Sequence, residues 1–147
     1  MCSVAGLRGY IVSRPFLGER VPQHVQNLVV RDFAERNGLK YLLSATEWAF
    51  PGSYNILEQV LADLKSIDGI ICYSMFILPE DQTYRNNIID DVLAEGRDIH
   101  FALENLSITS NQERCRVEDI WLTSSALCRN GNLVHEYLSS FLDEAVE

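Results

Sequence analysis

Short apolar runs alternate with longer segments of helical periodicity through most of this chain, and this alternation limits the possible folds more than any other feature. The apolar runs cover residues 7–13, 40–44, 69–73 and 98–103. Runs of this length, bounded by Gly, Pro, Asn or Ser, are typical of strands. Strands that alternate with helices predict an α/β domain with a parallel sheet of about four strands, joined by right-handed crossovers.

Three segments between these strands carry apolar side chains at helical spacing. The first begins at Pro22 and ends at Asn37-Gly38, because proline suits the first helical position and glycine the residue after the last. The second runs from Ser53, as its cap, to about residue 65, and the third runs from Pro79 to Gly96. The stripes predicted to face the core are Val21, Val25, Leu28, Val29 and Phe33, then Ile56, Leu57, Val60, Leu61 and Leu64, then Ile88, Ile89, Val92 and Leu93.

The C-terminal part of the chain departs from the alternating pattern. Residues 107–116 are polar and predict a loop, and residues 117–128 predict a helix. A further stripe at three- and four-residue steps consists of Val134, Tyr137, Leu138, Phe141, Leu142 and Ala145. Either the chain's own sheet or a second copy covers this stripe, and we expect a homo-oligomer, most simply a dimer. The predicted organisation is an α/β domain over 1–125 and a C-terminal helix for packing or oligomerisation over 126–147.

Composition indicates one globular domain without a membrane segment. The 147 residues are 47% hydrophobic, yet no apolar run reaches the roughly 18 residues of a membrane span. The N-terminus lacks the features of a signal peptide, so we expect a cytoplasmic protein. Its four cysteines form no C-x-x-C pair, and no set of four convergent ligands appears, so we expect no metal and no cofactor.

The net charge of −9 argues against a nucleic-acid partner. Basic side chains must neutralise a phosphate backbone, and here they are scattered singly through the chain. A local pocket that holds one phosphate remains compatible with this charge.

Polar residues follow each predicted strand, at the edge of the sheet where ligands of open α/β folds bind. They are Ser13 and Arg14, Thr46 and Glu47, Tyr73 and Ser74, and Glu104 and Asn105, and the first helix adds Gln23, His24 and Asn27. One arginine, two carboxylates, a tyrosine, a serine and a histidine can bind an anionic polyol and move its protons.

Within this set we assign Glu104 as the base, because a carboxyl directly after a buried strand is partly desolvated and its pKa is raised. Tyr73 or His24 is the candidate acid, and Arg14 with Ser13 holds a phosphate or an oxyanion. The remaining predicted substrate-binding residues are Gln23, Asn27, Glu47, Ser74 and Asn105. Each has a structural alternative: a turn or cap for Ser13, a surface charge for Arg14, a helix-surface position for His24, an exposed loop for Glu47 and a core position for Tyr73.

Four stretches resemble the sporadic carbohydrate cluster protein family, small bacterial proteins named for recurring in sugar-biosynthesis gene clusters. They are Arg-Gly-Tyr-Ile-Val-Ser-Arg-Pro-Phe at 8–16, Arg-Val-Pro-Gln-His-Val-Gln-Asn-Leu at 20–28, Tyr-Leu-Leu-Ser-Ala-Thr-Glu at 41–47 and Glu-Asp-Ile-Trp-Leu at 118–122. This resemblance covers about residues 7–125 and implies a place in a sugar pathway.

The stretch Gly-Tyr-Ile-Val-Ser at 9–13, followed by a helix that carries Gln26, is similar to the catalytic domain of serine recombinases, or resolvases. In that family a Tyr-x-Arg-x-Ser strand presents the nucleophilic serine, so the resemblance implies this position for Ser13 and a flavodoxin-like, resolvase-like sheet. Two departures concern the arginines that grip the scissile phosphate. Ile11 stands where the family has arginine, and Tyr-Ser-Met-Phe-Ile at 73–77 replaces the family's Asp-Arg-x-x-Arg segment.

From these observations the sequence predicts a carbohydrate or nucleoside biosynthetic enzyme that acts on a small molecule. The predicted reaction is a cofactor-independent dehydration (a lyase) or isomerisation of a sugar nucleotide or nucleoside intermediate. Two alternatives stay open: a non-catalytic ligand-binding or partner subunit of a sugar-pathway enzyme and, ranked last, a recombinase-like nuclease acting on DNA.

Overall fold

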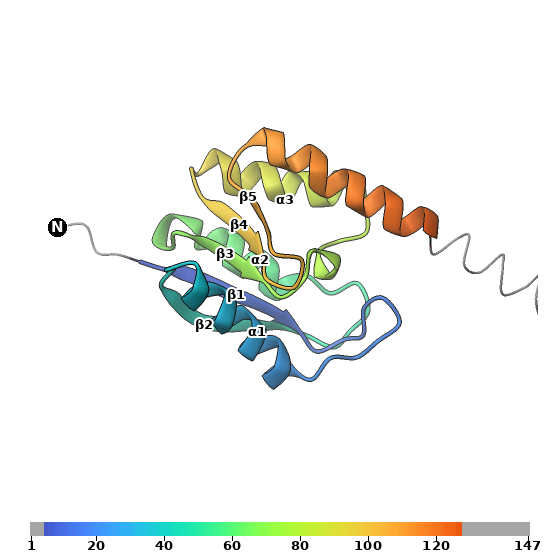
Figure 1. The fold of residues 1–147 in the computed structure, drawn as a ribbon, viewed down its shortest axis with the longest axis horizontal. Helices are drawn as coiled ribbons and strands as arrows, with labels where there is room; N and C mark the ends of the chain where they lie inside the picture. The colour runs from blue at the N-terminus through green and yellow to red at the C-terminus, as the bar shows by residue number, and fades with distance from the viewer. Residues whose placement is uncertain (1–4, 128–147) are drawn as a thin grey trace, which may run out of the picture. The chain divides into compact units, whose positions relative to one another are not determined.

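The computed structural model describes residues 5–127 as a sheet with helices on both faces (Figure 1). Its five strands lie in the order β2-β1-β3-β4-β5. They are β1 (Leu7–Val12), β2 (Tyr41–Glu47), β3 (Gly69–Cys72), β4 (Asp98–Phe101) and β5 (Leu106–Ile108). The first four pair in parallel and β5 pairs antiparallel with β4. The α/β fold with a mostly parallel sheet, predicted from the alternating pattern, is confirmed.

Three crossover helices connect the parallel strands. They are α1 (Gln23–Arg36), α2 (Asn55–Ala62) and α3 (Gln82–Ala94), and the short 3-10 helices η1 (Leu64–Ser66) and η2 (Met75–Ile77) interrupt two of the connections. α1 covers one face of the sheet, and α2 with α3 covers the other (Figure 1). The central strands are therefore buried on both sides, which is why β3 reads as a continuous apolar run.

The buried face of α1 differs from the predicted stripe. Val25 and Leu28 point to solvent, while Gln26, Val30 and Phe33 are buried. The apolar pattern alone cannot reveal this rotation, because the side-chain amide of Gln26 bonds to the backbone at the end of β1 and fixes that face of the helix against the sheet. In α2 and α3 the buried apolar side chains, among them Leu57, Val60, Ile88, Ile89 and Val92, belong to the predicted stripes, while the buried Arg85 of α3 does not.

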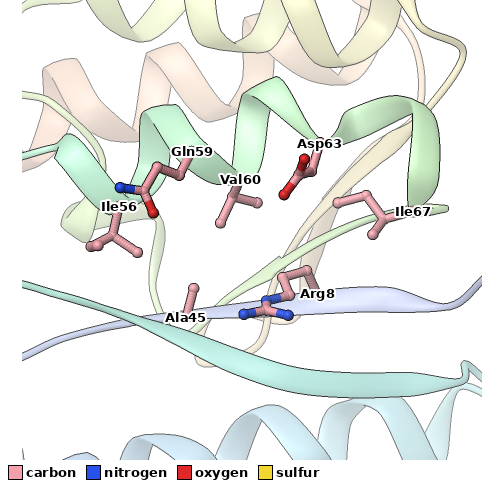
Figure 2. A pocket seen from close by; sticks show the side chains of 7 residues that line it. All are labelled: Arg8, Ala45, Ile56, Gln59, Val60, Asp63 and Ile67. Atoms are coloured by element: carbon pink, nitrogen blue, oxygen red, sulfur yellow. The ribbon is translucent and has the colours of Figure 1, made fainter.

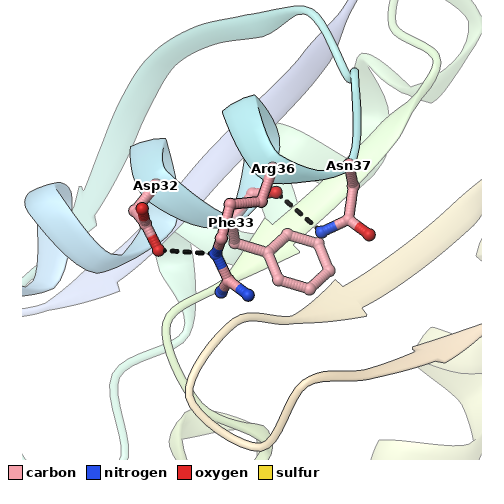
Figure 3. Close-up of polar contacts among 4 residues, drawn as sticks. All are labelled: Asp32, Phe33, Arg36 and Asn37. Atoms are coloured by element: carbon pink, nitrogen blue, oxygen red, sulfur yellow. Dashed lines mark hydrogen bonds and ion pairs between the residues drawn. The ribbon is translucent and has the colours of Figure 1, made fainter.

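The C-terminal end of α1 lies where the sequence predicts it. The side-chain amide of Asn37 donates to the carbonyl of Phe33 at 2.8 Å, and Gly38 follows with a positive φ of 65° (Figure 3). One residue earlier, Arg36 pairs with Asp32 at 2.8 Å on the exposed side of the helix. An exposed ion pair of this kind stabilises a helix by only about 0.3–0.5 kcal/mol. The end of α1 is therefore determined mainly by Gly38 and by the hydrogen bond from the Asn37 amide.

The segment after β4 corrects the prediction of a loop over residues 107–116. β5 occupies part of it, with Ile99 opposite Ile108, and a helix begins at residue 111. Three residues are too few for the alternating pattern of a strand to be recognised in the sequence. The burial of Ile108 in the core favours a strand over a loop here. β2 also continues through Glu47, three residues beyond its predicted end.

The chain divides into two compact units, Met1–Glu113 and Arg114–Glu147. The described part of the second unit is helical through residue 127. The stripe from Val134 to Ala145 lies outside the described residues, so its role in oligomerisation stays a prediction. Among residues 5–127 no helix is long and apolar enough to cross a membrane, and no group of three or more His, Cys, Asp or Glu side chains is placed to hold a metal ion.

Candidate functional site

The carboxyl ends of the parallel strands meet at one edge of the sheet. Val12 pairs with Glu47 across β1 and β2, Tyr10 pairs with Cys72 across β1 and β3, and Cys72 pairs with Phe101 across β3 and β4. The residues that follow each strand therefore emerge side by side, as in other open α/β sheets that bind ligands at this edge.

Ser13 is the first residue after β1 and is partly exposed. Its hydroxyl oxygen accepts a hydrogen bond from the side-chain amide of Gln23, at 2.8 Å, on the first turn of α1. The guanidinium of Arg20 donates twice to the carbonyl of Ser13, at 3.2 Å each. Because Oγ accepts from Gln23, its own proton remains available, and Arg20 adds a positive charge beside it.

Gln26 holds this strand end in place. Fully buried, it donates to the carbonyls of Val12 at 2.8 Å and Val21 at 2.9 Å, and accepts from the Val12 N–H at 3.1 Å. The sequence analysis gave it no site role, although a polar residue one turn before Val30 on an apolar face was a detectable signal. Arg20, which was also missed, lies in a loop with no periodic pattern to mark it.

Arg14 does not face Ser13's hydroxyl. Its two terminal nitrogens donate to the carbonyls of Ser53 at 2.8 Å and Ile77 at 3.2 Å, and its guanidinium lies over the ring of Tyr54, 4.7 Å from the centroid. Arg14 thus joins the β2–α2 loop to η2. A guanidinium engaged in this way is a weaker candidate for an anion clamp than Arg20.

Glu47 ends β2 and is fully buried instead of riding an exposed loop. Its carboxylate accepts from the backbone N–H of Leu57 at 3.1 Å and of Ile56 at 3.3 Å, from the Tyr10 hydroxyl at 3.0 Å and from the Ser53 hydroxyl at 3.1 Å. Burial raises the pKa of Glu47, but hydrogen bonds from the backbone and from Tyr10 bring it below its ordinary value. Glu47, and not Ser53, satisfies the first N–H groups of α2.

Glu104 follows β4 and lies against the start of η2. The Ser74 hydroxyl donates to Glu104, and the backbone N–H of Met75 donates to both its oxygens, at 3.1 and 3.3 Å. Burial raises the pKa of Glu104, although these hydrogen bonds partly offset the increase. Burial, together with the charge of Glu104, also raises the pKa of the Tyr73 phenol, which is therefore neutral at physiological pH.

The other predicted residues spread over a wider region. His24 is exposed on the first turn of α1, and Asn105 is exposed with a positive φ of 54°. Asn27 accepts from the Tyr41 hydroxyl at 3.4 Å, at the opposite end of β2. The structure therefore brings together Ser13, Gln23 and the overlooked Arg20 as one cluster, and Tyr73, Ser74 and Glu104 as another.

Among residues 5–113, two cavities bear on the choice of a site. One, of about 140 Å³, is lined by Arg8 and Asp63 and lies between β1 and α2 (Figure 2). Asp63 lies at the C-terminal end of α2, the negative end of that helix, so the lining combines a carboxylate with the guanidinium of Arg8. The other cavity, of about 300 Å³, lies at the carboxyl edge between Phe16 and Tyr73.

The strand order, the crossovers and the placement of the edge residues define a three-layer, flavodoxin-like α/β domain. Among solved structures, the chain is similar to the N-terminal catalytic domain of TP901-1 integrase, with 17% identity and a TM-score of 0.57, covering 84% of this chain and 97% of that one. It is also similar to a resolvase-family site-specific recombinase from Streptococcus pneumoniae, with 12% identity and a TM-score of 0.58, covering 96% and 99%. At these identities the likeness shows the fold, and it confirms the resolvase-like sheet.

No family model and no curated protein matches the chain, so the resemblance to the sporadic carbohydrate cluster family is not supported. The solved structures that share the fold are named as a recombinase and an integrase, which overturns the ranking made from the sequence. The prediction of a sugar lyase or isomerase is wrong, and so is the exclusion of nucleic acid in favour of a small-molecule sugar. The exclusion of nucleic acid rested on the net charge. That charge is a sum over the whole chain and does not describe the local charge at the edge where Ser13 and Arg20 meet.

Proposed function

We propose that this chain is a recombinase-like domain that binds DNA at the end of β1 and transfers a phosphodiester through Ser13. The observation that carries the proposal is the hydroxyl of Ser13, held by Gln23 at 2.8 Å with the guanidinium of Arg20 on the same residue. The names of the two similar structures favour this chemistry over others available to a serine at a strand end.

In the proposed reaction, the oxygen of Ser13 attacks the phosphorus of a DNA phosphodiester. A serine–phosphate ester bond forms, the bond from phosphorus to one deoxyribose oxygen breaks, the serine proton passes to water, and the departing oxygen takes a proton from water. One ester replaces another, so the step needs no oxidant and no energy source. Arg20 would stabilise the charge on the phosphoryl oxygens, and Gln23 would orient the nucleophile.

The acidic chain sets an expectation for affinity. With a net charge of −9 and few cations at the edge, binding should involve only one or two phosphates and depend weakly on salt. This function also requires a compartment that contains DNA, in keeping with the cytoplasmic location expected from the sequence.

The test is capture of the covalent intermediate. Labelled DNA that carries a nick opposite the cleavage position should give a denaturant-resistant protein–DNA adduct, and Ser13→Ala should lower its yield at least a hundredfold. The matched control is Ser66→Ala, because Ser66 is exposed in η1, away from the carboxyl ends of the parallel strands. An equal yield from Ser13→Ala and the wild type, or no adduct from any variant, would contradict the proposal.

A further inference from the structure

The cavity at the carboxyl edge has apolar walls and one acidic residue. It is lined by Phe16, Leu17, Glu19, Val21, Tyr73 and Leu103. Its volume of about 300 Å³ is at the lower end of the range of roughly 300–1,000 Å³ that is typical of small-molecule sites. None of the residues assigned to phosphodiester transfer lines it, so it is free to bind another part of a substrate.

Two aromatic rings shape the cavity. Phe16 and Tyr73 meet edge to face, with centroids 5.8 Å apart and planes at 73°. Within residues 5–127 no hydrogen-bond partner is seen for the Tyr73 hydroxyl, which is protonated and can donate. Flat aromatic rings next to a hydroxyl donor suit a flat, partly polar ligand.

Exposed apolar side chains and a tight turn border the mouth of the cavity. Leu17 and Leu103 are 58% and 54% exposed, so apolar side chains border the opening. Leu17 also adopts a φ of 50°, in the left-handed region that non-glycine residues seldom occupy. With Gly18, at a φ of 77°, Leu17 forms the centre of the tight turn between Phe16 and Glu19, and two-residue turns of this kind require positive φ.

The same loop connects the cavity to Ser13. Phe16 and Glu19 pair through both backbone hydrogen bonds at 3.0 Å, which closes a tight loop directly after the strand end. Arg20 follows Glu19 and reaches back to the carbonyl of Ser13. A ligand in the cavity and a phosphodiester at Ser13 would thus touch neighbouring residues of one short segment.

We propose that this cavity binds a single unstacked nucleobase that carries an exocyclic amino group, next to the phosphodiester at Ser13. The inference rests on the proposed function. The rings of Phe16 and Tyr73 supply the stacking and edge contacts, as they do where proteins bind unpaired bases. Glu19 accepts a hydrogen bond from the amino group, the pairing that carboxylates make with cytosine.

The experiment compares strands that differ only in their bases. Binding of fluorescently labelled single strands at low salt is measured for oligo-dC, oligo-dT and an abasic strand of equal length. We expect oligo-dC to bind about tenfold more tightly than the abasic strand, which is within the effect of stacking one base. Oligo-dC should also bind more tightly than oligo-dT, and Glu19→Gln should reduce that preference while leaving the abasic strand unaffected.

Variants of the rim give the structural control. Leu17→Gln and Leu103→Gln should lower the affinity for oligo-dC several-fold without changing that for the abasic strand. Leu43→Gln changes a residue that is 72% exposed and does not line the cavity, and it should have no effect. Because all three positions are exposed, the fold should survive each change.

The outcomes separate the two proposals. Equal binding of abasic and base-containing strands overturns the nucleobase site and leaves phosphodiester binding at Ser13 intact. Failure of every strand to bind overturns both. Base-dependent binding that Leu17→Gln and Leu103→Gln leave unchanged would also overturn the inference, because the base would then lie outside this cavity.

Discussion

Glu47 and Glu104 both lie at the carboxyl ends of parallel strands, yet their carboxyl groups have opposite surroundings. Glu47 is fully buried among N–H and O–H donors, which outweigh burial and lower its pKa. Glu104 has fewer donors, and burial raises its pKa. The comparison shows that the number of hydrogen-bond donors around a carboxyl group at a strand end affects its pKa more than its burial does. Many donors lower the pKa and keep the group charged, whereas burial with few donors raises the pKa.

The difference also separates structural from chemical roles at this edge. Glu47 substitutes for a side-chain cap on α2, because Tyr54, the residue before that helix, makes no capping hydrogen bond. Glu104 lies beside the aromatic cavity and influences Tyr73 through its charge. Three substitutions can test or sharpen this contrast.

The largest effect is expected for Glu47→Gln. The amide would turn two donors toward groups that themselves donate, so several buried hydrogen bonds would be lost, at a cost of about 2–4 kcal/mol in the free energy of unfolding. The folded-state pKa is depressed, so the stability contributed by Glu47 is present above the unfolded-state pKa and is lost as the pH falls through the folded-state value. Urea unfolding at neutral and acid pH measures both.

For that first test the control is Glu35→Gln, which removes a charge from the exposed face of α1 and should change stability by less than about 0.5 kcal/mol. A Glu47→Gln protein as stable as the wild type would show that the carboxylate is not what caps α2.

An intermediate effect is expected for Arg14→Lys. Lysine cannot reach both carbonyls in the planar geometry of a guanidinium or stack equally well on Tyr54, so unfolding should become easier by about 1–2 kcal/mol. Arg31→Lys is the matched control, because Arg31 lies over Tyr41 at 5.5 Å on the exposed side of α1. If thermal denaturation gives equal losses for the two variants, the bridging role of Arg14 is refuted.

The smallest effect, and the one of opposite sign, is expected for Glu104→Gln. An amide can still accept from Ser74 and Met75 but carries no buried charge, so the variant should be more stable than the wild type by at most about 1 kcal/mol at neutral pH. Because the folded-state pKa of Glu104 is raised, this advantage should appear as the pH rises from the unfolded-state pKa through the folded-state value. Unfolding at about pH 4 should show no gain, and a gain that is constant with pH would contradict the raised pKa.

Local patterns were sufficient for most of the fold. Apolar runs of five to seven residues and glycine stops such as Gly38 reflect short-range geometry, which each segment carries by itself. Consequently the four parallel strands, the three crossover helices and the shared edge of Ser13 and Gln23 were all predictable. β5 was not, since its three residues form a strand only where β4 offers an open edge.

The sequence by itself determined that this chain is an α/β domain whose strand ends collect polar residues at one edge. Only the tertiary structure decided which of those residues act together. Ser13, Arg14 and Glu47 look alike in sequence as polar residues at strand ends. Arg14 and Glu47 bond to backbone groups of distant segments, while the hydroxyl of Ser13 meets Gln23 and its carbonyl meets Arg20. Hydrogen-bond partners distant along the chain, and the burial they make possible, depend on how elements pack, and a local pattern carries no information about that packing.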